Sequence, residues 1–501
     1  MTKALPFLCL ENITVKSLNK VLFTNLNFNM NKGEHWAIVG ESGSGKTAFL
    51  STIAGILNVT KGRIYHAYFE RFKQQKNIDD PFFGIHQVVS FVQQKHHFRN
   101  LSNTGEFYYQ QRFNSANSED SQRVKEYLHS IKRGPVENRV WSIGRVIEIM
   151  HLDDLLDKEL IKLSNGETRR LLIGAALIKN PLLLLLDNPL TGLDTNSREE
   201  FLHIFSAIVK SGIAVVLSTS PTEIPDEISH VAVLKNGLIE KSCTRADYTA
   251  EVKEFKNTAP DTTQIQKFLK PLVTYTNIVK MTNVSVEYSG KKILNELNWQ
   301  VKQGERWALS GPNGAGKSTL LSLINGDNPQ AYSNDIILFD QQRGSGESIW
   351  DIKKKTGYVS PELLQYFPAG SNCMEIIESG FYDTLGLFRP ASDKYRNIIE
   401  NWMDLLQISQ YKNSLFSAVS ASIQRLCLLA RALAKNPTLL ILDEPCQGLD
   451  TQQQEHFKAI IDVVCMLNNS TLIYVTHYPE ELPPSINKFI HLEKGIAQII
   501  R

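Results

Sequence analysis

The sequence predicts an α/β fold that the chain builds twice. A glycine-rich loop of the form Gly-x-x-x-x-Gly-Lys-Ser/Thr occurs twice, each time after an apolar segment and before a helical pattern. Lys46 and Lys317, the lysines of the two loops, are 271 positions apart, and Asn12 and Asn283 in the strand-like sequence before them have the same separation. Well after each loop, a continuous apolar run ends in aspartate, which is typical of a buried parallel strand. We therefore expect two similar units, each with a mixed sheet and a helical insertion.

Both loops have the residue types that hold nucleotide phosphates. Their glycines leave backbone N–H groups free to wrap the phosphates, the lysine reaches the β- and γ-phosphates, and the hydroxyl that follows can ligate the accompanying metal. A chance turn before a helix would not need this complete pattern. The first loop consists of Gly40, Glu41, Ser42, Gly43, Ser44, Gly45, Lys46 and Thr47, and the second of Gly311, Pro312, Asn313, Gly314, Ala315, Gly316, Lys317, Ser318 and Thr319.

The composition is that of a globular protein, with 42% hydrophobic and 21% charged residues among 501. A formal net charge of +2 gives no broad basic field, so a dedicated nucleic-acid binder is not favoured. The six cysteines lie far apart and indicate reduced thiols without a metal site. The apolar runs are too short to cross a bilayer, so a membrane role would need a separate partner. We expect a cytoplasmic protein, either free or peripheral at the inner face of the cell membrane.

The first half reads as a series of strands and helices. Residues 8–29 alternate apolar and polar side chains as two strands do, and residues 65–81 look irregular. Residues 95–162 are rich in helix formers and predict a helical insertion. Ser164 and Glu167 then have the spacing of a capping box at the start of a helix.

The end of the first half predicts the inner strands of a sheet. The apolar run 182–187 predicts a buried parallel strand that delivers an acid to the phosphate site, and 213–218 predicts another. Residues 231–239 predict a closing hairpin.

The second half repeats this order. Strands are expected at 281–288 and 293–299, a helix from about Ser420, and buried strands at 439–443 and 471–475.

Composition also places the boundaries between the two units. The intervening stretch is polar, contains prolines and has too few apolar residues for a core. We expect a first domain at 1–240, a linker at 241–276 and a second domain at 277–501.

The sequence resembles the ATP-binding cassette ATPase family. The resemblance rests on five motifs in one order: the phosphate loop, a helical insertion, Leu-Ser-x-Gly-Glu, Leu-Leu-x-Leu-Asp and Gly-Leu-Asp. The runs 326–335 and 343–354 are similar to the ModF group, tandem ATPases named for molybdate transport and also called photorepair protein. The resemblance implies two P-loop NTPase domains in tandem that bind two ATP with Mg2+. It also implies that the two cassettes pack head to tail, so that each ATP lies between the phosphate loop of one and the signature motif of the other.

The resemblance assigns a complete set of residues to the site on the second loop. Glu444 would polarise the attacking water, His477 would sense the γ-phosphate, and Tyr288 would stack on adenine. Pro361 stands where the family has a glutamine. The catalytic residues would be Lys317, Asp443, Glu444 and His477, the metal ligands Ser318 and Asp443, and the signature residues from the first half Ser164, Asn165, Gly166 and Glu167.

The site on the first loop departs from the family in four places. Asn188 replaces the glutamate, and an amide cannot accept a proton. Thr219, or Ser220 with a one-residue gap, replaces the histidine, and Ser17 replaces the stacking ring. Ser422 replaces a glycine of the signature that begins at Ser420. The remaining nucleotide and metal ligands of this site would be Lys46, Thr47, Gln94, Asp187 and Ser420. Random decay would have scattered the losses over both sites, whereas all four fall in one. We therefore expect one site that hydrolyses ATP and one that mainly binds it.

Several of these residues also have a plain structural interpretation. Asp187 and Asp443 could cap strands, His477 could be a structural histidine, and Tyr288 could be an ordinary core or surface aromatic. The clusters Arg169-Arg170 and Lys353-Lys354-Lys355 are predicted to be solvated surface.

The process that ATP binding and hydrolysis would drive has three interpretations. The first is the energy-coupling subunit of a transporter whose permease is a separate integral membrane protein, with molybdate as the candidate substrate. The second is a soluble cassette ATPase that acts on ribosomes or nucleic acid, which the near-neutral charge does not favour. The third is a slow, nucleotide-dependent regulatory protein.

Overall fold

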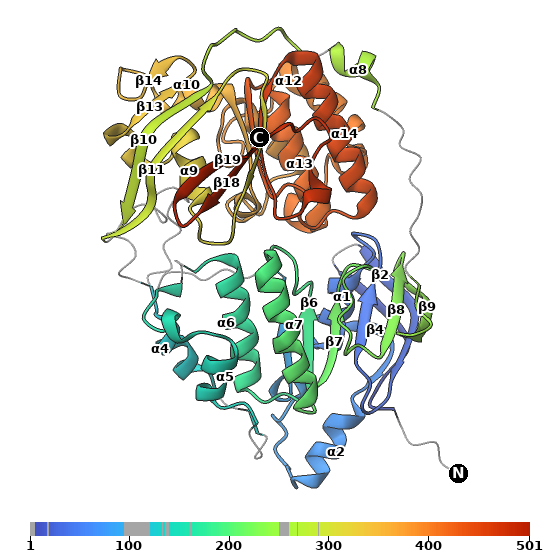
Figure 1. Cartoon of the computed structure of the whole chain (residues 1–501). Helices are drawn as coiled ribbons and strands as arrows, with labels where there is room; N and C mark the ends of the chain where they lie inside the picture. Colours follow the sequence, from blue (N-terminus) through green and yellow to red (C-terminus); the bar gives the residue numbers. More distant parts are fainter. Residues whose placement is uncertain are drawn as a thin grey trace. The chain divides into compact units, whose positions relative to one another are not determined.

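The computed structural model describes residues 6–17, 20–94, 121–132, 134–135, 140–160, 163–249, 260–267, 269–288 and 290–500. These residues form two compact units, and the break between them falls between residues 249 and 260. Figure 1 shows both units, coloured from blue to red along the chain. Each unit has a six-stranded mixed sheet, a smaller antiparallel sheet and several helices, so the predicted α/β class is confirmed.

The six-stranded sheet of the first unit is parallel except at β9, and its order is β5-β6-β7-β3-β8-β9. The smaller sheet has the order β2-β1-β4. The strands are β1 (Leu8–Ser17), β2 (Lys20–Met30), β3 (Trp36–Val39), β4 (Val59–Tyr65), β5 (Val89–Val92), β6 (Leu183–Asp187), β7 (Ala214–Ser218), β8 (His230–Lys235) and β9 (Leu238–Thr244). The helices are α1 (Lys46–Ile53), α2 (Ala67–Gln75), α4 (Val124–Ser130), α5 (Ile143–Ile149), α6 (Asn165–Ile178) and α7 (Thr195–Lys210).

The second unit repeats this architecture. Its large sheet has the order β15-β16-β17-β12-β18-β19 and its small sheet the order β11-β10-β13-β14. The strands are β10 (Val279–Tyr288), β11 (Lys291–Val301), β12 (Arg306–Ser310), β13 (Asp335–Leu338), β14 (Gln341–Gln342), β15 (Thr356–Val359), β16 (Leu439–Asp443), β17 (Thr471–Val475), β18 (Lys488–Glu493) and β19 (Ile496–Ile500). The helices are α8 (Thr262–Gln266), α9 (Lys317–Ile324), α10 (Ile349–Lys355), α11 (Cys373–Glu378), α12 (Asp393–Leu405), α13 (Ala421–Ala434) and α14 (Thr451–Asn468).

The buried central strands explain why both units need helices on two faces of the sheet. In β6, Leu183 and Leu185 pack into one core cluster with α1, whereas Leu184 and Leu186 pack into a second cluster with α5, α6 and α7. In the second unit, β16 is divided in the same way between the clusters around α9 and around α11 to α14. A strand that is covered on both faces reads as a continuous apolar run, which is the pattern in the sequence.

Two stretches of the first unit were predicted as irregular (65–81) and helical (95–162). The stretch 65–81 contains α2, so the prediction of irregular structure was wrong; Phe69 and Phe72 of this helix stack on Phe83. The helical insertion is present in its described part as α4 and α5, while 95–120 lie outside the described residues.

The predicted domain boundaries stay predictions, although two elements extend into the expected linker. Strand β9 continues to Thr244, beyond the expected boundary at 240. Helix α8 lies within 241–276 and buries Ile265 in a core cluster of the second unit.

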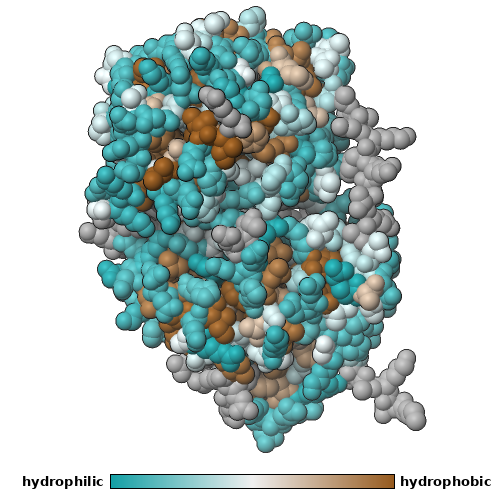
Figure 2. Space-filling model, viewed as in Figure 1, coloured by the Kyte–Doolittle hydropathy of each residue, from teal (hydrophilic) through white to brown (hydrophobic). Residues whose placement is uncertain are grey.

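The surface is mixed in hydropathy on the face shown in Figure 2. On the face drawn in Figure 2, hydrophobic residues form patches among mostly hydrophilic ones. Among the described residues, no helix is both long and apolar enough to span a membrane.

Candidate functional site

Two phosphate loops lie between a central strand and a helix, one in each unit. The loop of the first unit connects β3 to α1, and the loop of the second connects β12 to α9. Gly45 and Gly316 cap these helices with φ of 106° and 103°, a left-handed conformation that favours glycine. A Cβ on Gly40 would lie 2.1 Å from the carbonyl oxygen of Leu234, so a side chain is also excluded there.

The lysine of each loop turns back onto its own backbone. Lys46 Nζ donates to the carbonyl oxygens of Gly40 at 2.6 Å and Glu41 at 2.9 Å. Lys317 Nζ makes the matching bonds to Gly311 at 2.7 Å and Pro312 at 3.1 Å. Both ammonium groups are thereby positioned over the loop and beside a helix N-terminus, where a phosphate group would bind.

The residues of the first loop fit a nucleotide. Ser44 Oγ is buried and has no hydrogen-bond partner among the described residues, so it has a free donor and acceptor at the loop. Thr47, which follows the lysine, donates from Oγ1 to Asp187 Oδ2 at 2.8 Å. Hydroxyl and carboxylate oxygens together are ligands that Mg2+ prefers.

Asp187 is the centre of a hydrogen-bond network in the first unit. Ser218 Oγ donates to Asp187 Oδ1 at 2.6 Å and accepts from the Asn188 backbone N–H at 2.9 Å. Asn188 Nδ2 donates to Gln94 Oε1 at 3.3 Å. The structure therefore brings together Thr47, Gln94, Asp187 and Asn188, which the sequence had placed at one site; it also adds Ser218, which sequence reasoning missed.

The second unit places an acid where the first has an amide. Glu444 follows β16, and its Oε1 lies 3.3 Å from His477 Nε2. The side chains of Glu444 and His477 are 16% and 5% exposed. Gln447 Nε2 donates to Glu444 Oε2 at 3.3 Å. The structure thus brings Glu444 and His477, which the sequence placed at one site, next to each other in the second unit. Asp443 precedes Glu444 at the end of β16.

Tyr288 has a structural role in this unit. It ends β10, packs against the core cluster around α9, and accepts a hydrogen bond at Oη from Asn328 Nδ2 at 2.8 Å. Asn328 is buried and also donates to Ser322 Oγ at 3.2 Å. The half-buried ring supports the interpretation as a packed aromatic, and stacking on adenine stays a prediction.

The two signature helices begin differently. Ser164 Oγ accepts from the Glu167 backbone N–H at 3.3 Å, while Glu167 Oε2 accepts from the Ser164 backbone N–H at 2.8 Å. This confirms the predicted capping box of α6. In α13 Ser420 Oγ contacts only the Ile423 backbone N–H, at 3.4 Å, and Ser422 Oγ, at 2.9 Å. Because residue 423 is apolar, this helix has no reciprocal cap.

The predicted solvation of the two basic clusters was wrong for some of their members. Arg169 is 8% exposed and donates to the carbonyl oxygens of Gln93 at 2.9 Å and Gln94 at 3.1 Å. Burial lowers the pKa of Arg169 to about 10. Lys353 pairs with Asp327 at 2.8 Å. The arginine is buried because it holds the end of β5, where two carbonyl groups need donors.

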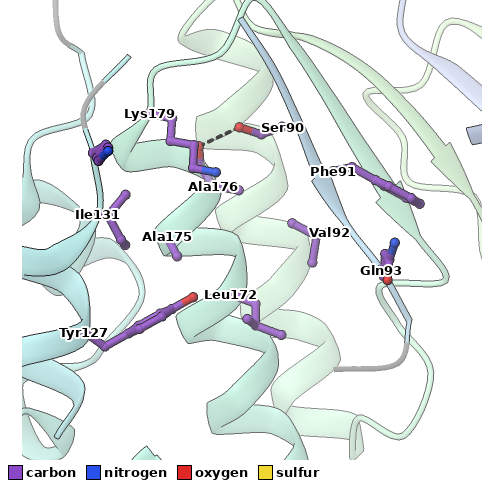
Figure 3. Close-up of a pocket in the computed structure, with 11 residues that line it drawn as sticks. Ser90, Phe91, Val92, Gln93, Tyr127, Ile131, Leu172, Ala175, Ala176 and Lys179 are labelled. Carbon is purple, nitrogen blue, oxygen red and sulfur yellow. Dashed lines mark hydrogen bonds between the residues drawn. The ribbon is translucent and has the colours of Figure 1, made fainter. Parts of the chain in front are cut away.

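A cavity of about 410 Å³ lies elsewhere in the first unit, between β5, α4 and α6. Figure 3 shows Tyr127 and Ile131 on one side of it and Phe91 and Val92 on another. Its α6 wall includes Ala175 and Lys179.

The equivalent region of the second unit has a much smaller cavity, of about 20 Å³, which Asp383 and Arg431 help to line. There α13 carries Arg431 and Lys435, 256 positions after Ala175 and Lys179. Arg431 Nε donates to Ser379 Oγ at 3.1 Å, and Lys435 pairs with Asp383. The two units therefore differ in the size of this cavity, which lies apart from the phosphate loops.

Comparisons with known proteins agree with this arrangement. The family model described as ABC transporter matches residues 23–191 and 294–447. The chain is 34% identical over 476 residues to the ABC transporter ATP-binding protein ModF of Escherichia coli, with 91% of each chain covered. It is 30% identical over 494 residues to an uncharacterized ABC transporter ATP-binding protein of Schizosaccharomyces pombe, with 98% of each covered.

Solved structures share the tandem fold at low identity. One is the RNase-L Inhibitor, with 19% identity, a TM-score of 0.53, and coverage of 97% of this chain and 90% of that one. Another belongs to a model of ribosome-bound archaeal Pelota and ABCE1, with 19% identity, a TM-score of 0.62, and coverage of 100% and 79%. The fold, the two phosphate loops and the two matched regions lead to one conclusion: this chain belongs to the ATP-binding cassette ATPases, with two cassettes in tandem.

Proposed function

We propose that the two nucleotide sites of this ATPase are unlike, and that the site on the second phosphate loop hydrolyses ATP while the site on the first mainly binds it. The observation that carries the proposal is the contrast between Glu444, which lies 3.3 Å from His477, and Asn188, whose amide donates to Gln94. A carboxylate can accept the proton of an attacking water, whereas an amide cannot.

Each residue of the second site has a role in this proposal. Lys317 and the N–H groups at the start of α9 bind the phosphates, and Ser318 and Asp443 are the groups that would hold Mg2+. The bound ion would neutralise the charge that develops on the phosphoryl oxygens. Glu444 accepts the proton of the attacking water, and His477, whose Nε2 lies 3.3 Å from Glu444 Oε1, senses the γ-phosphate.

The signature residues complete the assignment. Family resemblance supports giving Ser164, Asn165, Gly166 and Glu167 to the nucleotide on the second loop, and Ser420 to the nucleotide on the first. The capping box orients the first backbone N–H groups of α6, and such groups favour an anion.

A pair of substitutions tests the unlike sites. Glu444→Gln is expected to lower steady-state ATP hydrolysis by about a hundredfold or more, since it removes the proton acceptor. Asn188→Ala, the matched change in the first unit, is expected to leave most of the activity. Phosphate release at saturating ATP measures both. Equal activity of Glu444→Gln and the wild type would refute the assignment.

For the mechanical output, we propose the energy-coupling role in a transporter, with a separate membrane permease and molybdate as the candidate substrate. The name of the Escherichia coli relative, an ABC transporter ATP-binding protein, supports this, and its resemblance extends over both cassettes. A ribosomal role is the second candidate. The ribosome-bound structure has the same tandem fold, but at 19% identity it supports the fold alone.

Isolation of the partner distinguishes these roles. The Glu444→Gln protein, held with ATP in its native cell, is expected to stay with the membrane fraction and to co-purify with one integral membrane protein. Uptake of radiolabelled molybdate is then compared between cells with and without the chain. Loss of uptake in the cells that lack it would identify molybdate as the substrate. Recovery on ribosomes instead would replace the transporter role and leave the ATPase chemistry intact.

A further inference from the structure

Gln447 connects Glu444 to a buried arginine in the second unit. Arg425 Nη2 donates to Gln447 Oε1 at 3.1 Å, and Gln447 Nε2 donates to Glu444 Oε2 at 3.3 Å. A guanidinium can only donate and a carboxylate can only accept. The amide must therefore present its oxygen to Arg425 and its nitrogen to Glu444, which fixes the orientation of Gln447.

Arg425 is buried close to two carboxylates. It is 2% exposed, and its Nε and Nη1 are buried without a hydrogen-bond partner among the described residues. Burial lowers the pKa of Arg425 to about 10, and the carboxylates of Glu444 and Asp443 oppose that shift. A buried cation with unused donors is costly unless nearby anions compensate for it. Its hydrogen bond to Gln447 and the two carboxylates supply that compensation.

The first unit has the same turn without this connection. The backbone N–H of Thr191 donates to the Asn188 carbonyl at 3.2 Å, just as that of Gln447 donates to the Glu444 carbonyl at 3.3 Å. Residue 191 is 256 positions before 447 and is a threonine. Arg169, the counterpart of Arg425, binds the end of β5 instead.

In each unit a glutamine contacts the residue that follows the buried strand, Asn188 after β6 or Glu444 after β16. The glutamine comes from a different element in the two units. In the first unit Gln94, just beyond β5, contacts Asn188. In the second unit the chain has Pro361 beyond β15, where Gln94 stands in the first, so a side-chain amide is missing there. Gln447 provides an amide to the equivalent residue, Glu444, from the turn after β16.

We propose that Gln447, supported by Arg425, is the positioning residue of Glu444 and replaces the glutamine that Pro361 removes. This inference rests on the proposed role of Glu444 in hydrolysis. Gln447 restricts the rotation of the carboxylate through its hydrogen bond to Glu444 Oε2. Among the residues that the structure describes, this connection occurs in the unit with the acid. Because it acts on Glu444, its loss is expected to affect turnover and to leave nucleotide binding unchanged.

Two substitutions of Gln447 separate positioning from a structural role. Gln447→Ala removes both bonds and is expected to lower kcat by about tenfold to a hundredfold with little change in KM for ATP. Gln447→Glu keeps the size and the bond to Arg425 but faces Glu444 with a second negative charge. It is expected to keep its Tm and still lose kcat, whereas a structural residue would tolerate it.

Matched controls complete the experiment. Thr191→Ala in the first unit is expected to match the wild type. Arg425→Lys is expected to lower kcat. The double variant with Gln447→Ala is expected to have a kcat close to that of Gln447→Ala alone, because both changes break the same connection to Glu444. Wild-type kcat in Gln447→Ala and Gln447→Glu would overturn the inference while leaving the role of Glu444 intact, provided Glu444→Gln is inactive in the same assay. Full activity of Glu444→Gln would overturn both.

Discussion

At the scale of single residues, the position after the central strand combines chemistry with backbone strain. Glu444 has φ 44° and Asn188 has φ 45°, both in the left-handed region. Asparagine adopts this region several-fold more readily than most residues, and glutamate does not share that preference. The second unit therefore keeps glutamate in a conformation that suits asparagine better, as is common for residues of a functional site.

This strain leads to a stability prediction. Glu444→Asn and Glu444→Gln both remove the carboxylate that compensates Arg425, but only asparagine relieves the left-handed backbone. The free energy of unfolding of Glu444→Asn is therefore expected to exceed that of Glu444→Gln by up to about 1 kcal/mol. The same change is expected to abolish hydrolysis. Chemical denaturation without nucleotide measures the first effect. Glu444→Gln is the control for the lost charge, and equal free energies of unfolding for the two variants would contradict the prediction.

At the scale of elements, the two signature helices should differ in how strongly their first residue stabilises them. Ser164 takes part in a reciprocal cap, whereas Ser420 makes one long bond to the backbone of α13. Ser164→Ala is expected to cost about 1 kcal/mol of unfolding free energy, and Ser420→Ala less. Thermal unfolding of each variant checks this, and an equal loss would contradict it.

Some helices and strands could be predicted from the sequence and others could not. β6 and β16 were predictable because strands covered on both faces have continuous apolar runs. Helix α2 was not, because only a few of its side chains, among them Phe69 and Phe72, are buried in an otherwise polar stretch. The positions of Asp187, Glu444 and His477 followed from motif order. Gln447 and Arg425 did not, because their contacts depend on side-chain directions in a turn and on a helix packed against it.

At the scale of the whole molecule, duplication predicts two nucleotides per chain. Two complete phosphate loops are present, and each lysine binds its own loop carbonyls. Equilibrium dialysis with Glu444→Gln is expected to give two ATP per chain. Lys46→Ala and Lys317→Ala in that background are each expected to give one. A value of one before any lysine is changed would show that the first site does not bind.

Because the two units are joined in one polypeptide, every molecule has the two kinds of cassette in equal number. In an assembly of two identical cassettes, a change from Glu444 to asparagine would appear in both copies at once. Here Asn188 occurs in one unit only, and every molecule carries one of each kind. The ratio of the two cassettes is set by translation and needs no pairing between separate gene products. Under the proposed assignment, the cassette that mainly binds ATP is therefore always made together with the one that hydrolyses it.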